Sequence, residues 1–170
     1  KQNQQRVRRY TRPDPNDDGG SSFDSNAISP GTAFMVALTA HIDAHLREAE
    51  VSRKWGGLRI AFSDASIPGE GEHKIIDFVR VTKSSHPHHS YCIYANDADL
   101  VMLTLGTHVD AMLVVRDEPY DAEYSVIDIG VLAADIVAMI RWEGGEFDGR
   151  RAIVDFITLF TLVGNDFIPR

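Results

Sequence analysis

Apolar and polar residues follow one another along the chain in blocks that predict strands and helices in turn. Four short apolar runs predict strands: 58–63, 91–95, 111–116 and 124–129. The first of them shows little polar alternation, which is typical of a strand covered on both faces. In other segments apolar residues recur every three or four positions, which predicts helices over 72–81, 130–142 and 150–162 and a further helix from 100 onward. Strands that alternate with helices predict an α/β layered domain with a largely parallel sheet.

The N-terminal part of the chain adds two expected helices and a loop. In residues 1 to about 11, long polar side chains recur at the spacing of one helix face: Lys1, Gln5, Arg8, Arg9 and Arg12. A solvated helix end explains this face as well as a functional one does. Residues 12 to 27 are rich in Pro, Gly, Asp and Ser, which predicts a mobile loop. Ser29 as N-cap and Pro30 as the first helical residue then open a second helix.

Some side chains of these helices can be placed from the pattern. The second helix presents an apolar stripe of Phe34, Met35, Leu38, Ile42 and Leu46. His41 and His45 lie one turn apart on it, but Ile42 stands where a zinc-protease helix carries Glu, so we expect two histidines on a half-exposed helix and no zinc-protease site. The helix over 72–81 is expected to bury Ile75, Ile76 and Val79.

Composition narrows the class of protein. The 170 residues suit one domain with a sizeable core, and no apolar run is long enough to span a bilayer or to serve as a signal peptide. The single cysteine, Cys92, excludes an internal disulfide and fits the cytosol or the nucleus. The net charge is −8, yet the first twelve residues carry five basic side chains and no acid. The chain lacks an initiator Met and ends behind an apolar segment, so both ends are expected to be cuts.

Acidic residues gather directly after apolar elements. Glu70 and Glu72 follow the turn at Pro68 and Gly69, and Asp97 and Asp99 follow the run 91–95. Ligands of open α/β sheets collect at the carboxyl ends of strands, and residues two apart in an extended segment point to the same side. Each pair can therefore present both carboxylates to one space. A fifth acid, Asp166, lies beside Gly164 at the end of the last helix.

These acids favour a site for a divalent cation. Like charges a few ångströms apart cost about 1 kcal/mol even at high effective dielectric, and a cation offsets that cost. Carboxylates without cysteine or suitably spaced histidine suit Mg²⁺ or Mn²⁺ better than zinc. Two such ions about 4 Å apart clamp the attacking and leaving oxygens of a phosphodiester during hydrolysis. Solvated acids at loop ends explain any one pair equally well, but three clusters together favour the metal site.

Five segments resemble the signature segments of the XRN family of 5′→3′ exoribonucleases, in that family's order. They are Asn3-Gln-Gln-Arg-Val-Arg-Arg9, Ile28-Ser-Pro-Gly-Thr-Ala-Phe-Met35, Pro68-Gly-Glu-Gly-Glu-His-Lys-Ile75, Asp97-Ala-Asp-Leu100 and Leu162-Val-Gly-Asn-Asp-Phe-Ile-Pro169. The resemblance implies a PIN/flap-nuclease-like (Rossmann-like) α/β fold in which helices flank a mostly parallel sheet. It also implies degradation of RNA bearing a 5′-monophosphate to mononucleotides, with two Mg²⁺ (or Mn²⁺) ions.

The resemblance further implies roles for individual residues. The family's metal ligands map onto Glu70, Glu72, Asp97, Asp99 and Asp166, and its 5′-phosphate pocket maps onto Lys1, Gln5, Arg8 and Arg9. A pocket of Lys, an amide and two Arg binds a terminal phosphate through charge-assisted hydrogen bonds and rejects a capped or triphosphorylated end by size. Further acidic ligands of the family lie upstream of the segment that matches Lys1 to Arg9.

Two alternatives stay open. One is a PIN- or flap-type endonuclease with the same acidic site; the other is a catalytically incomplete RNA-binding fragment. We expect residues 1–170 alone to be weakly active or inactive as part of one nuclease domain, with Phe156, Phe160 and Phe167 leaving apolar surface exposed. The sequence does not separate a nuclear from a cytoplasmic enzyme, and it indicates no protein partner.

Overall fold

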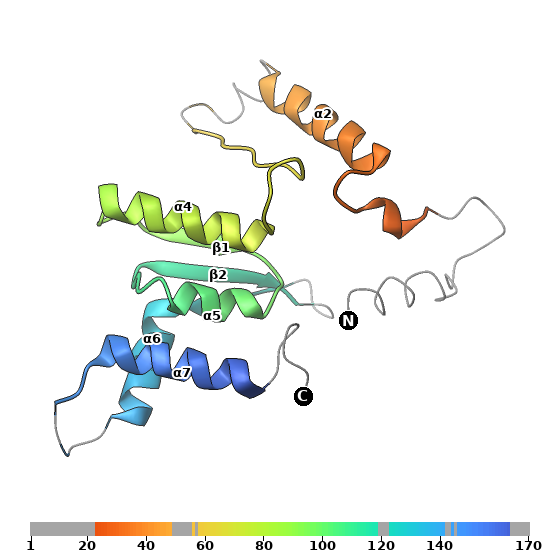
Figure 1. The fold of residues 1–170 in the computed structure, drawn as a ribbon. Helices are drawn as coiled ribbons and strands as arrows, with labels where there is room; N and C mark the ends of the chain where they lie inside the picture. Colours follow the sequence, from red (N-terminus) through yellow and green to blue (C-terminus); the bar gives the residue numbers. More distant parts are fainter. Residues whose placement is uncertain are drawn as a thin grey trace. The chain divides into compact units, whose positions relative to one another are not determined.

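The computed structural model describes residues 23–48, 56, 58–118, 123–141, 144 and 146–163 (Figure 1). The chain divides into two compact units, Lys1–Gly69 and Glu70–Arg170. In the described residues, the first unit contains a short 3-10 turn, η1 (Ser25–Ala27), and one helix, α2 (Ala33–Arg47). The second unit contains a three-stranded sheet and the helices α4 to α7. No helix in this described part of the chain combines the length and the apolar character that a bilayer crossing requires.

Helix α2 begins later than the sequence predicts. Gly31 has a φ of +84°, so the backbone turns through the left-handed region there and the helix starts after it. The N-cap is Thr32, whose hydroxyl accepts a hydrogen bond from the Met35 N–H at 3.3 Å. The prediction of Ser29 as N-cap and Pro30 as first helical residue was therefore wrong. Most of the predicted stripe is half-buried, whereas Phe34 is exposed and packs on Phe23.

His41 and His45 are exposed on α2, which agrees with the expectation of histidines on a half-exposed helix.

The predicted strand over 58–63 was wrong. This segment has no regular secondary structure, and Leu58, at 69% exposure, is one of several apolar side chains that it leaves open to solvent. A strand needs the backbone hydrogen bonds of a neighbour, and the sheet of the described residues contains only β1, β2 and β3.

The sheet is mixed and not largely parallel. Its strands are β1 (Tyr91–Tyr94), β2 (Met112–Asp117) and β3 (Tyr124–Asp128), in the order β1-β2-β3. Strand β2 pairs parallel with β1 and antiparallel with β3, with Val114 opposite Ile93 and Ile127. The physical reason is the length of the connections, because residues 118–123 are too few for the crossover that a parallel pair requires. The broader prediction of a mixed α/β fold is confirmed.

Four helices accompany this sheet close to their predicted positions: α4 (Gly71–Ser85), α5 (Asp99–Leu105), α6 (Ile129–Ile140) and α7 (Gly149–Val163). Helix α4 buries Ile76 and Val79 as predicted, but Ile75 stays 38% exposed. Successive helical residues differ by about 100° in direction. The buried stripe runs through Ile76, so its neighbour Ile75 points away from the core.

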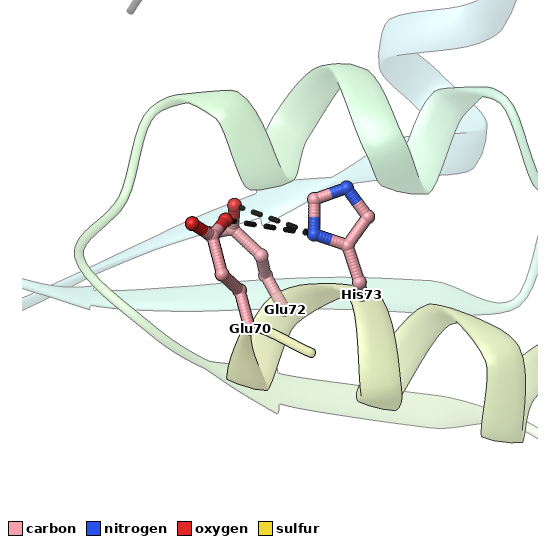
Figure 2. Close-up of side chains that lie close together, drawn as sticks. All are labelled: Glu70, Glu72 and His73. Carbon is pink, nitrogen blue, oxygen red and sulfur yellow. Dashed lines mark ion pairs between the residues drawn. The ribbon is translucent and has the colours of Figure 1, made fainter. Parts of the chain in front are cut away.

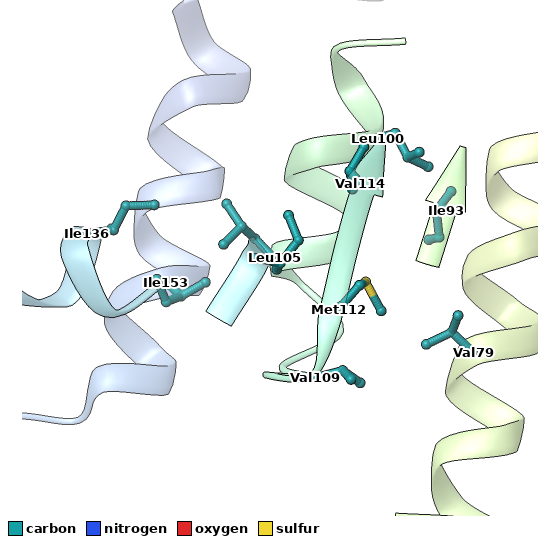
Figure 3. Packing of buried hydrophobic residues seen from close by; sticks show 10 residues of the cluster. Val79, Ile93, Leu100, Leu105, Val109, Met112, Val114, Ile136 and Ile153 are labelled. Carbon is teal, nitrogen blue, oxygen red and sulfur yellow. The ribbon is translucent and has the colours of Figure 1, made fainter. Parts of the chain in front are cut away.

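The core lies on one side of the sheet. Figure 3 shows Met112 and Val114 of β2 between Val79 of α4 and the side chains Ile136 and Ile153 of α6 and α7. Side chains of the opposite sheet face, such as Tyr94 and Val126, are exposed. Because α4 packs into the core through Val79 and α5 through Leu100 and Leu105, the N-terminal ends of both helices are fixed beside the carboxyl end of β1.

Candidate metal centre

The first acidic pair lies at the beginning of α4 and does not follow a strand. Glu70 is the N-cap residue: its carbonyl accepts the Lys74 N–H at 3.1 Å, while its side chain makes no capping hydrogen bond. Glu72 lies in the first turn. Figure 2 shows the two carboxylates projecting in the same direction from this helix end. Their carboxylates are therefore available for another function.

A histidine that the sequence did not predict as a site residue lies beside them. His73 Nδ1 is 3.6 Å from a carboxylate oxygen of Glu70 and 3.9 Å from one of Glu72 (Figure 2). One ligand atom from each of the three residues lies within 4.8 Å of the others. The signal available in the sequence was the spacing, because His73 follows Glu70 by three residues and such pairs are neighbours on a helix.

The second acidic pair lies between β1 and α5. The Asp99 N–H donates to Asp97 Oδ1 at 3.0 Å, and Asp99 is the first residue of α5. This local bond turns the chain out of the strand and into the helix, in the manner of an Asx turn. Both side chains are exposed.

The electrostatics of Glu72 link the two pairs. Burial raises the pKa of the Glu72 carboxyl, and the negative charges of Asp97, Glu70 and Asp99 raise it further, while His73 acts in the opposite sense. Three carboxylates from the starts of two helices thus lie close enough to oppose the ionisation of a fourth. We call Glu70, Glu72, Asp97 and Asp99 the acidic cluster.

The acidic cluster is unfavourable without a counter-charge. One like-charge contact at about 4 Å costs on the order of 1 kcal/mol in water, and more where solvent is excluded. The positive end of α4 returns roughly 0.3–1 kcal/mol for each acid in its first turn. Glu72, with a side chain only 21% exposed, feels the unfavourable interactions most. The carboxylate oxygens of the acidic cluster fit a hard divalent cation such as Mg²⁺ or Mn²⁺, whereas the imidazole of His73 is a ligand type that softer metals prefer.

A cavity of about 540 Å³ lies elsewhere in this unit. Its lining includes Asp110, before β2, and Ile129, after β3, so it opens at the end of the sheet opposite Asp97 and Asp117. No residue of the acidic cluster lines it. The candidate centre is therefore identified by its chemistry and not by the size of a cavity.

Five of the predicted site residues lie outside the described residues. They are Asp166 and the expected phosphate-binding set of Lys1, Gln5, Arg8 and Arg9. Most of the loop predicted over 12–27 and Phe167 lie outside them as well. The roles predicted for these residues stay predictions.

Comparison with known proteins identifies the family. A family model described as the XRN 5′-3′ exonuclease N-terminus matches residues 1–118. The chain is 34% identical over 164 residues to 5′-3′ exoribonuclease 2 of Yarrowia lipolytica, with 86% of this chain and 16% of the relative covered.

Two further relatives give the same result. Identity is 33% over 174 residues to 5′-3′ exoribonuclease 1 of Saccharomyces cerevisiae, with 88% of this chain and 11% of the relative covered. It is also 33% over 168 residues to 5′-3′ exoribonuclease 1 of Homo sapiens, with 86% of this chain and 10% of the relative covered. The chain thus spans between about a tenth and a sixth of these relatives' length. These matches confirm the resemblance to the family, and the chain belongs to the XRN 5′→3′ exonuclease family.

Proposed function

We propose that this chain supplies part of the catalytic centre of a 5′→3′ exoribonuclease that degrades 5′-monophosphorylated RNA to mononucleotides. The observation that carries the proposal is the convergence of Glu70 and Glu72 with Asp97 and Asp99 in a chain of the XRN family. The names of the relatives, 5′-3′ exoribonuclease 1 and 2, support the reaction class. A PIN/flap-nuclease-like arrangement of the whole catalytic domain belongs to the same proposal.

In this proposal the acidic cluster and Asp166 hold two Mg²⁺ or Mn²⁺ ions. Such ions, when bound, stabilise the attacking and leaving oxygens of an in-line phosphodiester displacement. The chain's own carboxylates hold and orient the cations and take no proton from the substrate. A bound cation also reverses the electrostatic penalty on Glu72, whose ionised form is disfavoured by burial and by three neighbouring acids.

The 5′ end of the substrate is assigned to the N-terminal basic face. Lys1, Gln5, Arg8 and Arg9 offer donors of the type that binds a terminal phosphate through charge-assisted hydrogen bonds. A pocket that fits one phosphate group excludes a triphosphate or a cap. This exclusion separates an exonuclease from an endonuclease that shares the same metal centre.

The proposal is tested by degradation of 5′-monophosphorylated RNA by the full-length protein in Mg²⁺. Substitution of a residue that only orients a metal ligand typically costs 10–100-fold in affinity or activity. Loss of a ligand itself in Asp97→Ala is therefore expected to cost at least about 100-fold in activity. Asp135→Ala, an exposed acid on α6, is the matched control and should retain wild-type activity. Undiminished activity in Asp97→Ala would refute the assignment.

A second arm separates the endonuclease alternative. The same RNA with a 5′-triphosphate should resist degradation by an exonuclease, whereas an endonuclease cuts it internally. Release of mononucleotides from the monophosphorylated RNA alone supports the proposal. Internal fragments from both RNAs would favour a PIN- or flap-type endonuclease.

A further inference from the structure

The loop that carries Asp97 is hydrogen-bonded to strand β2 at the first residue of the loop. Residues 95–98 lead from β1 to α5, and the Ala95 N–H donates to the Val115 carbonyl at 3.0 Å, which is the last backbone bond between this loop and β2. Beyond Ala95 the chain leaves the sheet. Asp97 therefore lies where backbone pairing no longer fixes the main chain.

The side chain and carbonyl of Asn96 continue the attachment to β2. Asn96 Oδ1 accepts the Asp117 N–H at 2.9 Å, and Asn96 Nδ2 donates to Asp117 Oδ2 at 3.2 Å. The carbonyl oxygen of Asn96 accepts from Arg116 Nη2 at 3.0 Å. A side-chain amide thus replaces the backbone hydrogen bonds that a longer β1 would make. These three bonds fix the residue directly before Asp97.

Asp117 is in turn held by a second donor. The Tyr94 hydroxyl donates to Asp117 Oδ2 at 2.6 Å, so one carboxylate oxygen receives both Tyr94 and Asn96. These two hydrogen bonds lower the pKa of the Asp117 carboxyl, which keeps it ionised and a strong acceptor. We call Tyr94, Asn96, Arg116 and Asp117 the Asn96 network.

The Asn96 network is distinct from the acidic cluster. The carboxylates that act on Glu72 are Asp97, Glu70 and Asp99, and Asp117 is not among them. Asp117 lies in register with Tyr124, and Tyr94 is exposed on the sheet face opposite the core. The network thus supports the loop from its outer side, while the acidic cluster lies at the ends of the helices.

We propose that Asn96 and Asp117 are positioning residues for the metal centre: they hold the backbone at Asn96 so that the Asp97 carboxylate faces Glu72. This inference rests on the proposed function, because it assigns to the network the orientation of a proposed metal ligand. Groups that orient a metal ligand in this way typically change metal affinity by 10–100-fold when they are removed. A purely structural surface network would instead change stability and leave metal affinity alone.

The test measures Mn²⁺ binding by the full-length protein without RNA, by electron paramagnetic resonance of the free ion. Asp97→Ala defines the share of bound Mn²⁺ that belongs to the centre. In Asn96→Ala and in Asp117→Ala, the dissociation constant of that share is expected to rise roughly tenfold. Asp117→Asn keeps an acceptor oxygen for Tyr94 and Asn96, so it should stay within about twofold of the wild type. Asp135→Ala, on exposed α6, is the matched control and should leave Mn²⁺ binding unchanged.

Activity and stability supply two further readouts. In Asn96→Ala and Asp117→Ala, saturating Mg²⁺ should restore kcat, with the KM for RNA unchanged, because the ligands are displaced and not lost. Thermal unfolding should shift little, since Tyr94, Asn96 and Asp117 are exposed. If Asn96→Ala fails to fold, Mn²⁺ binding by Asp117→Ala tests the positioning role, because Asp117 belongs to β2 and not to the loop itself.

Three outcomes overturn the inference, and they differ in what they say of the proposed function. Wild-type Mn²⁺ affinity in Asn96→Ala and Asp117→Ala, with binding lost in Asp97→Ala, would refute the positioning role and leave the metal centre standing. Wild-type Mn²⁺ binding in Asp97→Ala would refute the metal centre itself, and the positioning role with it. A tenfold loss in Asp117→Asn equal to that in Asp117→Ala would show that the charge of Asp117, and not its hydrogen bonds, acts on the ion.

Discussion

Glu72 is the residue of the acidic cluster whose ionisation is most strongly opposed by its surroundings. Its side chain is 21% exposed, compared with 59% for Glu70 at the same helix end. Burial and three neighbouring carboxylates together raise the pKa of Glu72, whereas Glu70 remains open to water. In the absence of a cation, the ionised form of Glu72 therefore lowers the stability of the fold.

We expect Glu72→Gln to stabilise the metal-free protein at neutral pH while it weakens metal binding. A raised folded-state pKa means that the native state holds the proton more tightly than the unfolded chain does, so stability falls as pH rises through the interval between the ordinary and the raised pKa. Glutamine mimics the protonated form and removes this loss. The expected gain is up to about 1 kcal/mol, the size of one like-charge contact.

The measurement is chemical unfolding in EDTA at several pH values. The gain of Glu72→Gln should be full above the raised pKa, fade as pH falls through that interval, and vanish below the ordinary pKa of Glu, where both proteins are neutral at this position. Excess Mg²⁺ should reverse the order and favour the wild type. Glu123→Gln, at an exposed position, serves as control. A variant less stable than the wild type in EDTA at neutral pH would contradict the prediction.

The four acids of the cluster could be chosen from sequence because they stand in two short motifs with alternate acidic residues, Glu70 and Glu72 and Asp97 and Asp99. His73 was missed, because its three-residue spacing from Glu70 becomes a signal only once the start of helix α4 is known. The Asn96 network was missed for a related reason. Its bonds join Tyr94 and Asn96 to Arg116 and Asp117, and that distance along the chain closes only through the parallel register of β1 and β2.

At the scale of elements, apolar runs of similar sequence pattern differ in secondary structure, because a strand forms only where a neighbouring strand supplies backbone hydrogen bonds. The runs at 91–95 and 111–116 became β1 and β2, which pair with each other, whereas 58–63 has no regular secondary structure in the described chain. Periodicity reports which residues seek burial, but it contains no information on pairing. Helices depend less on distant contacts, so α4, α6 and α7 fall within a few residues of their predicted ranges.

Two adjacent residues of helix α4 offer a test of how much packing against the core stabilises the protein. Ile75 and Ile76 are adjacent and chemically identical, but Ile76 is 2% exposed and Ile75 is 38% exposed. We expect Ile76→Ala to cost about 2–5 kcal/mol of unfolding free energy, because it leaves a cavity beneath the helix. Ile75→Ala should cost clearly less, since solvent replaces the lost methyl groups. Denaturant unfolding of both variants measures the difference, and equal losses would contradict the observed burial.

At the scale of the molecule, much apolar surface of the described residues remains open. Phe160 is exposed on α7 as predicted from sequence, while Phe156 is half-buried against the core. Tyr124 and Val126 of β3, together with Leu162 of α7, are also exposed. Exposed apolar side chains in this number offer surface on which further protein can pack. The relatives, of which the chain spans 10–16%, contain much more protein to supply such contact.

We therefore expect the isolated 170-residue chain to self-associate and to show little Mg²⁺-dependent nuclease activity. Two octahedral ions need about a dozen oxygen ligands, and five predicted carboxylates leave much of that number to water and to other residues. Light scattering and turnover of 5′-monophosphorylated RNA by residues 1–170 and by the full-length protein test this directly. A monomeric 1–170 chain with turnover near that of the full-length protein would show that the acidic cluster suffices on its own.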